Sequence, residues 1–187
     1  MLFSARAAAL LATLAGLGTA QAANFYEQGG TSLGFKADGM AGIFSTSEDY
    51  LGEGGKDWRE AFIHGLLIGS TRSGRGEFYG GLGMIAKGSW GDGDAAGYTT
   101  GRERDVSLED AYLGWRDSDG TLDLSFGRQQ FQLGDGFLIA GDRINLGRGL
   151  RQFGVDVDRG GAYYLAASKS FHNTAILRFD PSGPLRG

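Results

Sequence analysis

The chain has 187 residues, a formal net charge of -4 at pH 7, 35 glycines, two prolines and no cysteine. Glycine far exceeds its usual share of about 7%, but the lack of a Gly-X-Y period and the near absence of proline exclude collagen. The absence of cysteine excludes a disulfide scaffold, a zinc ribbon and thiol catalysis, and the lack of a basic block argues against a nucleic-acid partner.

The first 22 residues have the composition of a secretory signal peptide. A basic start, Met1 to Arg6, precedes an apolar run from Ala7 to Gly18, and Ala20-Gln21-Ala22 has the small-x-small pattern of a cleavage site. We expect residues 1–22 to be removed on export and residues 23–187 to form the mature domain. Beyond residue 22, no apolar stretch is long enough for a transmembrane helix.

After residue 30 the chain repeatedly alternates apolar with polar residues. Side chains on a strand point alternately to opposite faces, so this period of two predicts strands with one apolar and one polar face. The expected strands are 32–44, 58–71, 77–90, 107–116, 122–127 and 162–171, with the beginning of another at 174–179. The faces of 58–71 are less clean, because Phe62, His64 and Leu66 share a side.

Two all-β architectures fit this alternation. One is a soluble antiparallel sandwich, and the other is an antiparallel transmembrane β-barrel, whose apolar face contacts lipid while its polar face lines a wet lumen. Strand length favours the barrel, because a bilayer needs strands of about 9–11 residues, whereas soluble strands have about five or six. Four aromatic residues near strand ends are typical of an interfacial girdle: Phe44, Trp58, Trp90 and Trp115. Export would then place the protein in the outer membrane of a Gram-negative bacterium.

The strands recognised here do not suffice to close a barrel. They number six with the beginning of a seventh, whereas bacterial single-chain barrels have an even number of at least about eight. The last residues contain both prolines, which cannot donate to a strand ladder. We therefore expect either two unrecognised strands in a small eight-stranded barrel or, preferably, the amino-terminal part of a larger barrel.

The densest pattern contains Ala111 to Leu113, then Gly127 to Gln129 and Gly134 to Gly136, and later Asp158 to Gly160. Together these motifs resemble the amino-terminal half of the alginate export family of outer-membrane porins, over about residues 57 to 170. The chain departs from the family pattern at Leu133, where an aromatic residue is expected, and at Arg159 inside the last motif. The resemblance implies an even-stranded barrel, larger than this chain can form, that passes an alginate-like polyuronate.

If the resemblance holds, the chemistry of the lumen is electrostatic. Guanidinium groups in a narrow channel attract carboxylates, and each planar guanidinium can hold one carboxylate with two hydrogen bonds. The arginines expected to meet the solute are Arg128, Arg143, Arg148, Arg151 and Arg159. For Arg128, the alternative is an ion pair with Asp110 or Glu109 on the preceding strand. Other lumen-facing residues are expected to form interstrand ion pairs: Lys36, Asp38, Glu77, Lys87, Asp110, Arg116 and Asp123.

The sequence indicates no catalytic, cofactor or metal site. His64 and His172 have no metal-type spacing, and Glu109 and Asp110 are adjacent on a strand, so they should point to opposite faces. The first hypothesis is therefore a porin whose partners are membrane lipid and a diffusing anionic or sugar-like solute. The second is a complete eight-stranded barrel with a structural or adhesive role. The third is an outer-membrane lipid hydrolase, which would need a Ser–His pair.

Overall fold

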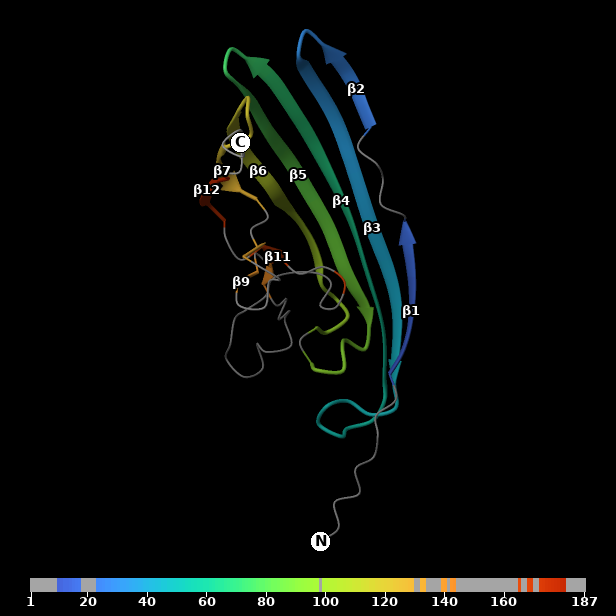
Figure 1. Cartoon of the computed structure of the whole chain (residues 1–187). Helices are drawn as coiled ribbons and strands as arrows, with labels where there is room; N and C mark the ends of the chain where they lie inside the picture. Colours follow the sequence, from blue (N-terminus) through green and yellow to red (C-terminus); the bar gives the residue numbers. More distant parts are fainter. Residues whose placement is uncertain are drawn as a thin grey trace.

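The computed structural model describes residues 10–17, 23–97, 99–129, 132–133, 139–140, 142–143, 165, 168–169 and 172–180. Every regular element among these residues is a strand (Figure 1). The strands of the main sheet are β1 Leu10–Leu17, β2 Ala23–Gln28, β3 Thr31–Thr46, β4 Lys56–Ser73, β5 Gly76–Gly91, β6 Arg104–Asp117, β7 Leu122–Arg128 and β12 Thr174–Phe179. Two short pairs join β8 Gln132–Leu133 with β9 Ile139–Ala140, and β10 Asp142–Arg143 with β11 Ser168–Lys169. The described part of the chain contains no helix of the length and apolarity needed to cross a membrane.

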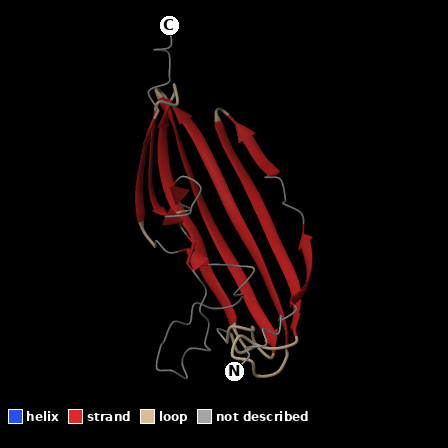
Figure 2. Ribbon diagram, turned by 60° about the horizontal axis from the view of Figure 1, so that its bottom comes forward, coloured by secondary structure: helices blue, strands red, loops and turns tan. Residues whose placement is uncertain are grey.

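One antiparallel sheet contains all the long strands. Its order is β1-β3-β4-β5-β6-β7-β12. Strand β2 also pairs with β3, at residues 31–35, whereas β1 pairs with residues 39–46 of β3. Figures 1 and 2 show that this sheet is strongly curved. The predicted all-β antiparallel class is confirmed, while the described strands form an open sheet, since β1 and β12 do not pair with each other.

Most of the expected strands are present and slightly longer than expected. Strands β3 to β7 correspond, in order, to the strands expected at 32–44, 58–71, 77–90, 107–116 and 122–127. Strand β12 corresponds to the one expected to begin at 174–179. Strand β2 was not expected. The strand expected at 162–171 lies outside the described residues, apart from Leu165 and β11. Strand β1 lies inside the expected signal peptide, whose removal stays a prediction.

The connections alternate in length along the sheet. Short turns at 29–30, 74–75 and 118–121 lie at one end, and the longer connections 47–55 and 92–103 lie at the other (Figure 1). The longest connection, 129–173, begins midway along the sheet, since Arg128 at the end of β7 is paired with Ala111 of β6. In the two-residue turn between β2 and β3, Gly29 and Gly30 have φ angles of 61° and 79°. Glycine suits these positions, because a tight hairpin turn of this kind needs positive φ at both central residues.

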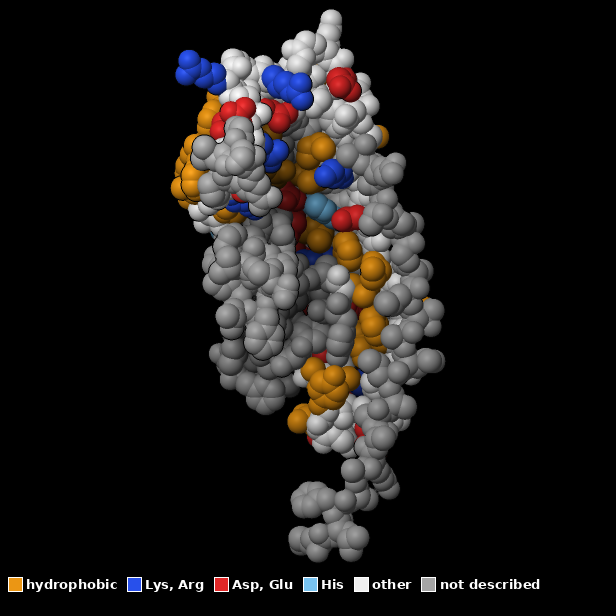
Figure 3. Space-filling view, viewed as in Figure 1, with side chains coloured by type: hydrophobic (Ala, Val, Ile, Leu, Met, Phe, Trp, Pro, Cys, Tyr) orange, Lys and Arg blue, Asp and Glu red, His pale blue; other side chains and the backbone are white. Residues whose placement is uncertain are grey.

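The two faces of the sheet have opposite polarity. Directly paired residues share a face, and exposed large apolar side chains occupy one face along all the long strands. We call it the outer face; its members are Leu33, Phe35, Ile43, Ile63, Leu67, Phe78, Leu82, Met84, Trp90, Val106, Leu108, Leu113, Phe126, Leu177 and Phe179. The opposite, inner face carries most of the charged strand residues, and Figure 3 shows charged side chains gathered in the hollow of the molecule. The predicted alternation is confirmed.

Two of the four aromatic residues expected in an outer girdle lie on the inner face instead. Phe44 and Trp58 are paired across β3 and β4, are 4% and 1% exposed, and stack with ring centroids 5.1 Å apart. The girdle prediction was wrong for them. Both lie near strand ends, but both have the parity of the inner face in the alternation of their strands. Trp90 and Trp115 do occupy outer-face positions.

An apolar patch therefore lies within the otherwise polar inner face. Leu165, from the connection between β7 and β12, packs against the buried cluster of Phe44, Trp58 and Ala95 and also against Ile85, which Phe62 contacts as well. Its backbone N–H donates to the buried carboxylate of Glu60 at 3.1 Å. The packing of Leu165 explains why β4 carries apolar as well as polar side chains on its inner face.

Candidate functional site

Five charged side chains form a continuous row across the inner face, close to the short turns. The register places Arg72 opposite Glu77, Glu77 opposite Arg116, Arg116 opposite Asp123, and Asp123 opposite Arg178. Opposite residues in an antiparallel ladder lie side by side on one face, so the row crosses β4, β5, β6, β7 and β12 with alternating sign. We call these five residues the charged row.

The acids of the charged row lie deeper than the arginines. Asp123 is 7% exposed and accepts hydrogen bonds from Arg116 Nε at 3.1 Å, from Arg116 Nη2 at 2.8 Å and from the Tyr79 hydroxyl. The Arg116 side chain is 47% exposed, and Arg72 and Arg178 are exposed as well. The surface that the row presents is therefore mainly guanidinium, which suits carboxylate recognition.

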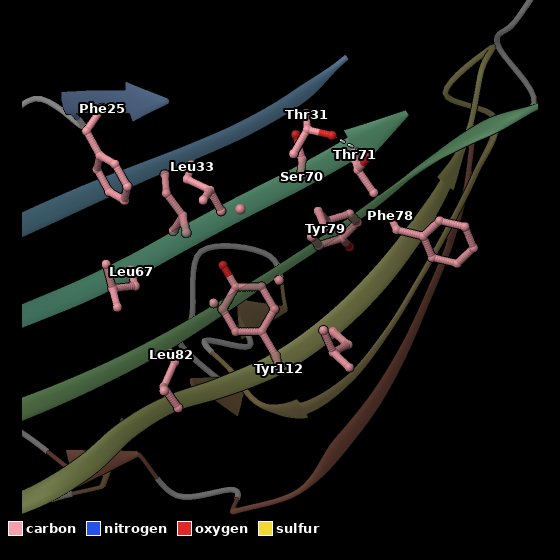
Figure 4. Close-up of a pocket in the computed structure, with 15 residues that line it drawn as sticks. Phe25, Thr31, Leu33, Leu67, Ser70, Thr71, Phe78, Tyr79, Leu82 and Tyr112 are labelled. Carbon is pink, nitrogen blue, oxygen red and sulfur yellow. Dashed lines mark hydrogen bonds between the residues drawn. The ribbon is translucent and has the colours of Figure 1, made fainter. Parts of the chain in front are cut away.

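Two tyrosines pack beside the row on glycines of the facing strand. Tyr79 on β5 lies opposite Gly114, and Tyr112 on β6 lies opposite Gly81, with the two rings edge to face at 6.4 Å (Figure 4). A Cβ atom at Gly81 would lie 2.7 Å from the Tyr112 ring, so each glycine leaves room for the tyrosine across from it. Arg116 lies over the Tyr79 ring at 5.4 Å. The Tyr79–Gly114 pair thus positions the ring and hydroxyl that contact Arg116 and Asp123.

Replacing Gly81 with valine is expected to lower the stability of the sheet by about 1–3 kcal/mol, because the new side chain would overlap the Tyr112 ring. Thermal unfolding in detergent measures the change. Tyr112→Ala in the Gly81→Val background should remove most of this added penalty, since the overlapping ring is gone. An equal penalty with and without the Tyr112 ring would contradict the packing argument.

A second inner-face cluster contains a histidine between two carboxylates. His64 Nδ1 lies 3.2 Å from Asp38 Oδ1, and His64 Nε2 lies 2.7 Å from Asp110 Oδ2. The second contact crosses β5 at Gly83, where a Cβ atom would lie 2.7 Å from Asp110 Oδ2 and 3.1 Å from His64 Nε2. The absence of a side chain at Gly83 therefore allows β4 and β6 to be bridged.

The expectation that Glu109 and Asp110 point to opposite faces was wrong. The register between β5 and β6 shifts at Gly83/Met84, which leaves one extra residue in β6. Both carboxylates lie between the outer-face residues Leu108 and Ala111, and they are 7% and 6% exposed. In a β-bulge, two residues of one strand lie opposite a single residue of the other strand. Two adjacent side chains can therefore both point away from the outer face.

Arg128 is part of the wall of the sheet. Its Nη2 lies 3.2 Å from Glu109 Oε2, its Nε donates to the Glu109 carbonyl at 3.1 Å, and its Nη1 lies 2.7 Å from His172 Nδ1. The ion pair with Glu109 is the alternative considered from the sequence. Of the other arginines expected to meet the solute, Arg143 belongs to β10 but its side chain is not described, and Arg148, Arg151 and Arg159 lie outside the described residues.

The remaining lumen candidates all lie on the inner face, at different depths. Lys36 and Asp38 are exposed, Glu77 is half-buried, and Lys87 and Asp110 are buried. Sequence reasoning missed Arg72 and Arg178, although both have the inner-face parity of their strands. Their place in the charged row depends on the register of four strand pairs, which the alternation does not fix.

In the long connection between β5 and β6, Glu103 is buried and organises its own loop. Its carboxylate accepts hydrogen bonds from Ser89 Oγ at 2.6 Å, from the Thr100 N–H at 2.8 Å and from the Thr100 hydroxyl at 3.0 Å. Burial alone would raise the pKa of Glu103, but these hydrogen bonds outweigh burial and hold its pKa below the usual glutamate value.

We expect Glu103 to stabilise the protein most at neutral pH. A carboxyl whose pKa is lowered by folding adds stability above its unfolded pKa of about 4.3, and this contribution is lost as the pH falls through the lower folded value. Glu103→Gln should therefore lower the melting temperature in detergent at pH 7, and the gap from the unmodified protein should narrow below about pH 4. A gap that is the same at both pH values would contradict this role.

Among the described residues, no group of three or more His, Asp or Glu side chains could hold a metal ion. Both ring nitrogens of His64 face carboxylates, and Ser70 Oγ lies 3.1 Å from Ser32 Oγ. Comparisons with family models, with curated proteins and with solved structures gave no match for this chain.

Proposed function

We propose that the chain is part of the wall of an outer-membrane porin of the alginate-export type, through which an anionic, sugar-like solute such as a polyuronate diffuses. The single observation that carries this proposal is the opposite polarity of the two faces of one curved sheet. The signal peptide expected at residues 1–22 would direct the chain to export, and the inner face would line the lumen.

Lipid is the environment that suits the outer face. Each Å² of apolar surface left in water costs about 25 cal/mol, and soluble monomers rarely expose apolar patches larger than a few hundred Å². On β4, polar outer-face residues flank the apolar stretch at Arg59 and Thr71. The positions between them are Ala61, Ile63, Gly65, Leu67 and Gly69. Such a stretch approximates the 9–11 or so residues with which a tilted strand crosses a bilayer.

The charged row supports an anionic solute. Its arginines are exposed while Asp123 is covered, so a carboxylate that passes along the inner face meets guanidinium groups first. Arginine keeps its charge at any physiological pH and binds carboxylates in a bidentate manner. In a narrow, water-filled lumen a few such groups bias permeation toward anions.

The test is conductance of the native product, extracted from outer membranes and inserted into a planar bilayer. We expect open channels whose reversal potential in a KCl gradient indicates anion preference, with current reduced by added polyuronate. Cation preference would contradict the solute assignment. Complete absence of conductance by correctly inserted protein would favour the second hypothesis, a filled barrel with a structural or adhesive role.

A further inference from the structure

A basic and aromatic cluster lies on the outer face at the end of the long connections. Arg59 on β4 is paired with Trp90 on β5, and the Arg104 guanidinium from β6 lies over the Trp90 ring at 4.1 Å. All three residues occupy outer-face positions and are exposed to different degrees, Trp90 at 40%. We call Arg59, Trp90 and Arg104 the boundary cluster.

The local structure holds Arg104 in this position. Its Nη1 donates to the backbone carbonyls of Ser89 and Glu103. Gly88 makes room for it, since a Cβ atom there would lie 3.0 Å from Arg104 Cδ and 3.2 Å from the Trp90 ring. The guanidinium is therefore fixed beside the indole, where a cation gains from the negative face of the ring.

The two positive charges of the cluster are not neutralised by the described residues. Within that part of the chain, neither Arg59 nor Arg104 has a carboxylate at ion-pair distance. By contrast, Arg116 on the inner face and Arg128 at the end of β7 each pair with an acid. Two uncompensated guanidinium groups on the strands that flank Trp90 favour an external anion.

The chemistry of that anion follows from what adjoins the cluster. The next outer-face residues toward the middle of the strands are apolar and exposed, among them Ile63 and Val106, and Ile43 lies beside Arg59. A ligand that fits both parts has an anionic head for the arginines and hydrocarbon chains for the apolar surface. Tryptophan with arginine at the limit of an apolar band is typical of the lipid headgroup region.

We propose that the boundary cluster binds the phosphate headgroup of an anionic lipid in the leaflet next to the long connections, with its acyl chains against the apolar outer face. The inference rests on the proposed function, because it requires the outer face to lie in a bilayer. It adds a specific lipid site, made by Arg59 and Arg104 as phosphate ligands and by Trp90 as a positioning aromatic.

The test uses spin-labelled lipids and the native product reconstituted in phosphatidylcholine vesicles. Electron spin resonance separates lipid held at the protein surface from free lipid and compares labelled phosphatidic acid with labelled phosphatidylcholine. We expect phosphatidic acid to be preferred. Combining Arg59→Gln with Arg104→Gln should remove this preference, because each arginine is expected to raise the affinity of the site about fivefold. Arg75→Gln, in an exposed turn at the other end of the sheet, should leave it unchanged.

Each outcome decides a different point. Arg104→Lys keeps the charge and should retain most of the preference, which separates charge from folding effects. If the protein holds lipid at its surface but shows no preference for phosphatidic acid, the lipid site is overturned and the membrane assignment stays intact. The same conclusion follows if Arg75→Gln loses as much of the preference as the double arginine variant. The absence of a protein-held component for either lipid would overturn the proposed function itself.

Discussion

Leu67→Arg is expected to destabilise the inserted protein by about 2–4 kcal/mol, the cost of a basic residue at the middle of the lipid-facing side of a barrel. Leu67 is exposed on the outer face, between Phe35 on β3 and Leu82 on β5. In lipid, the guanidinium would be surrounded by hydrocarbon and by these apolar neighbours. In water, the same substitution would be nearly neutral, because the position is already exposed.

The neighbouring residue provides a matched control. Leu66 lies on the inner face, opposite Lys36 and Gly83, and Leu66→Arg introduces the same side chain one residue away. We expect Leu66→Arg to be much milder than Leu67→Arg when both are measured as the urea dependence of folding into phospholipid vesicles. A larger penalty at Leu66 than at Leu67 would mean that the inner face is the dry side and would contradict the proposed orientation.

Arg178→Gln together with Arg72→Gln should reduce anion preference strongly. Both arginines are exposed members of the charged row, and their removal leaves Glu77, Asp123 and one arginine, so that the row becomes net negative. If each lost charge contributes about 1 kcal/mol to the interaction with a passing ion, the permeability ratio falls about fivefold per arginine. Arg116 is kept, because its removal would leave buried Asp123 without its cation.

Reversal potentials in planar bilayers measure this effect. The control is Arg75→Gln, which removes the same charge from the turn between β4 and β5 and should leave the permeability ratio within error of the unmodified protein. An unchanged ratio in the double variant, with normal channel conductance, would show that solute does not pass along the charged row.

The alternation of side chains was sufficient to predict the strands and the assignment of most residues to a face. Leu113 and Tyr112, for example, fall on opposite faces in both the sequence pattern and the structure. This works because the period of two is a local property of an extended chain. The same rule places Phe44 on the inner face, and the girdle prediction was wrong there because nearness to a strand end does not decide which face a side chain occupies.

Features that depend on several strands could not be predicted. The charged row needs four registers to coincide, and register is set by turns and by face burial across the whole sheet. The bulge that turns Glu109 and Asp110 away from the outer face inserts one residue without an evident signal in the sequence. The hydrogen bond from the Leu165 N–H to Glu60 joins residues 105 positions apart, beyond any periodic pattern.

The most direct test of the account is a cysteine scan along β4, residues 61–69, in a chain that has no cysteine of its own. Each single cysteine receives a nitroxide label in reconstituted protein, and its collision rates with oxygen, which is enriched in lipid, and with a water-soluble nickel chelate are measured. The account predicts a strict period of two, with labels at Ile63 and Leu67 accessible to oxygen and labels at His64 and Leu66 accessible to the nickel chelate or sheltered from both. High chelate accessibility at Ile63 and Leu67 would contradict it, because the apolar outer face would then lie in water.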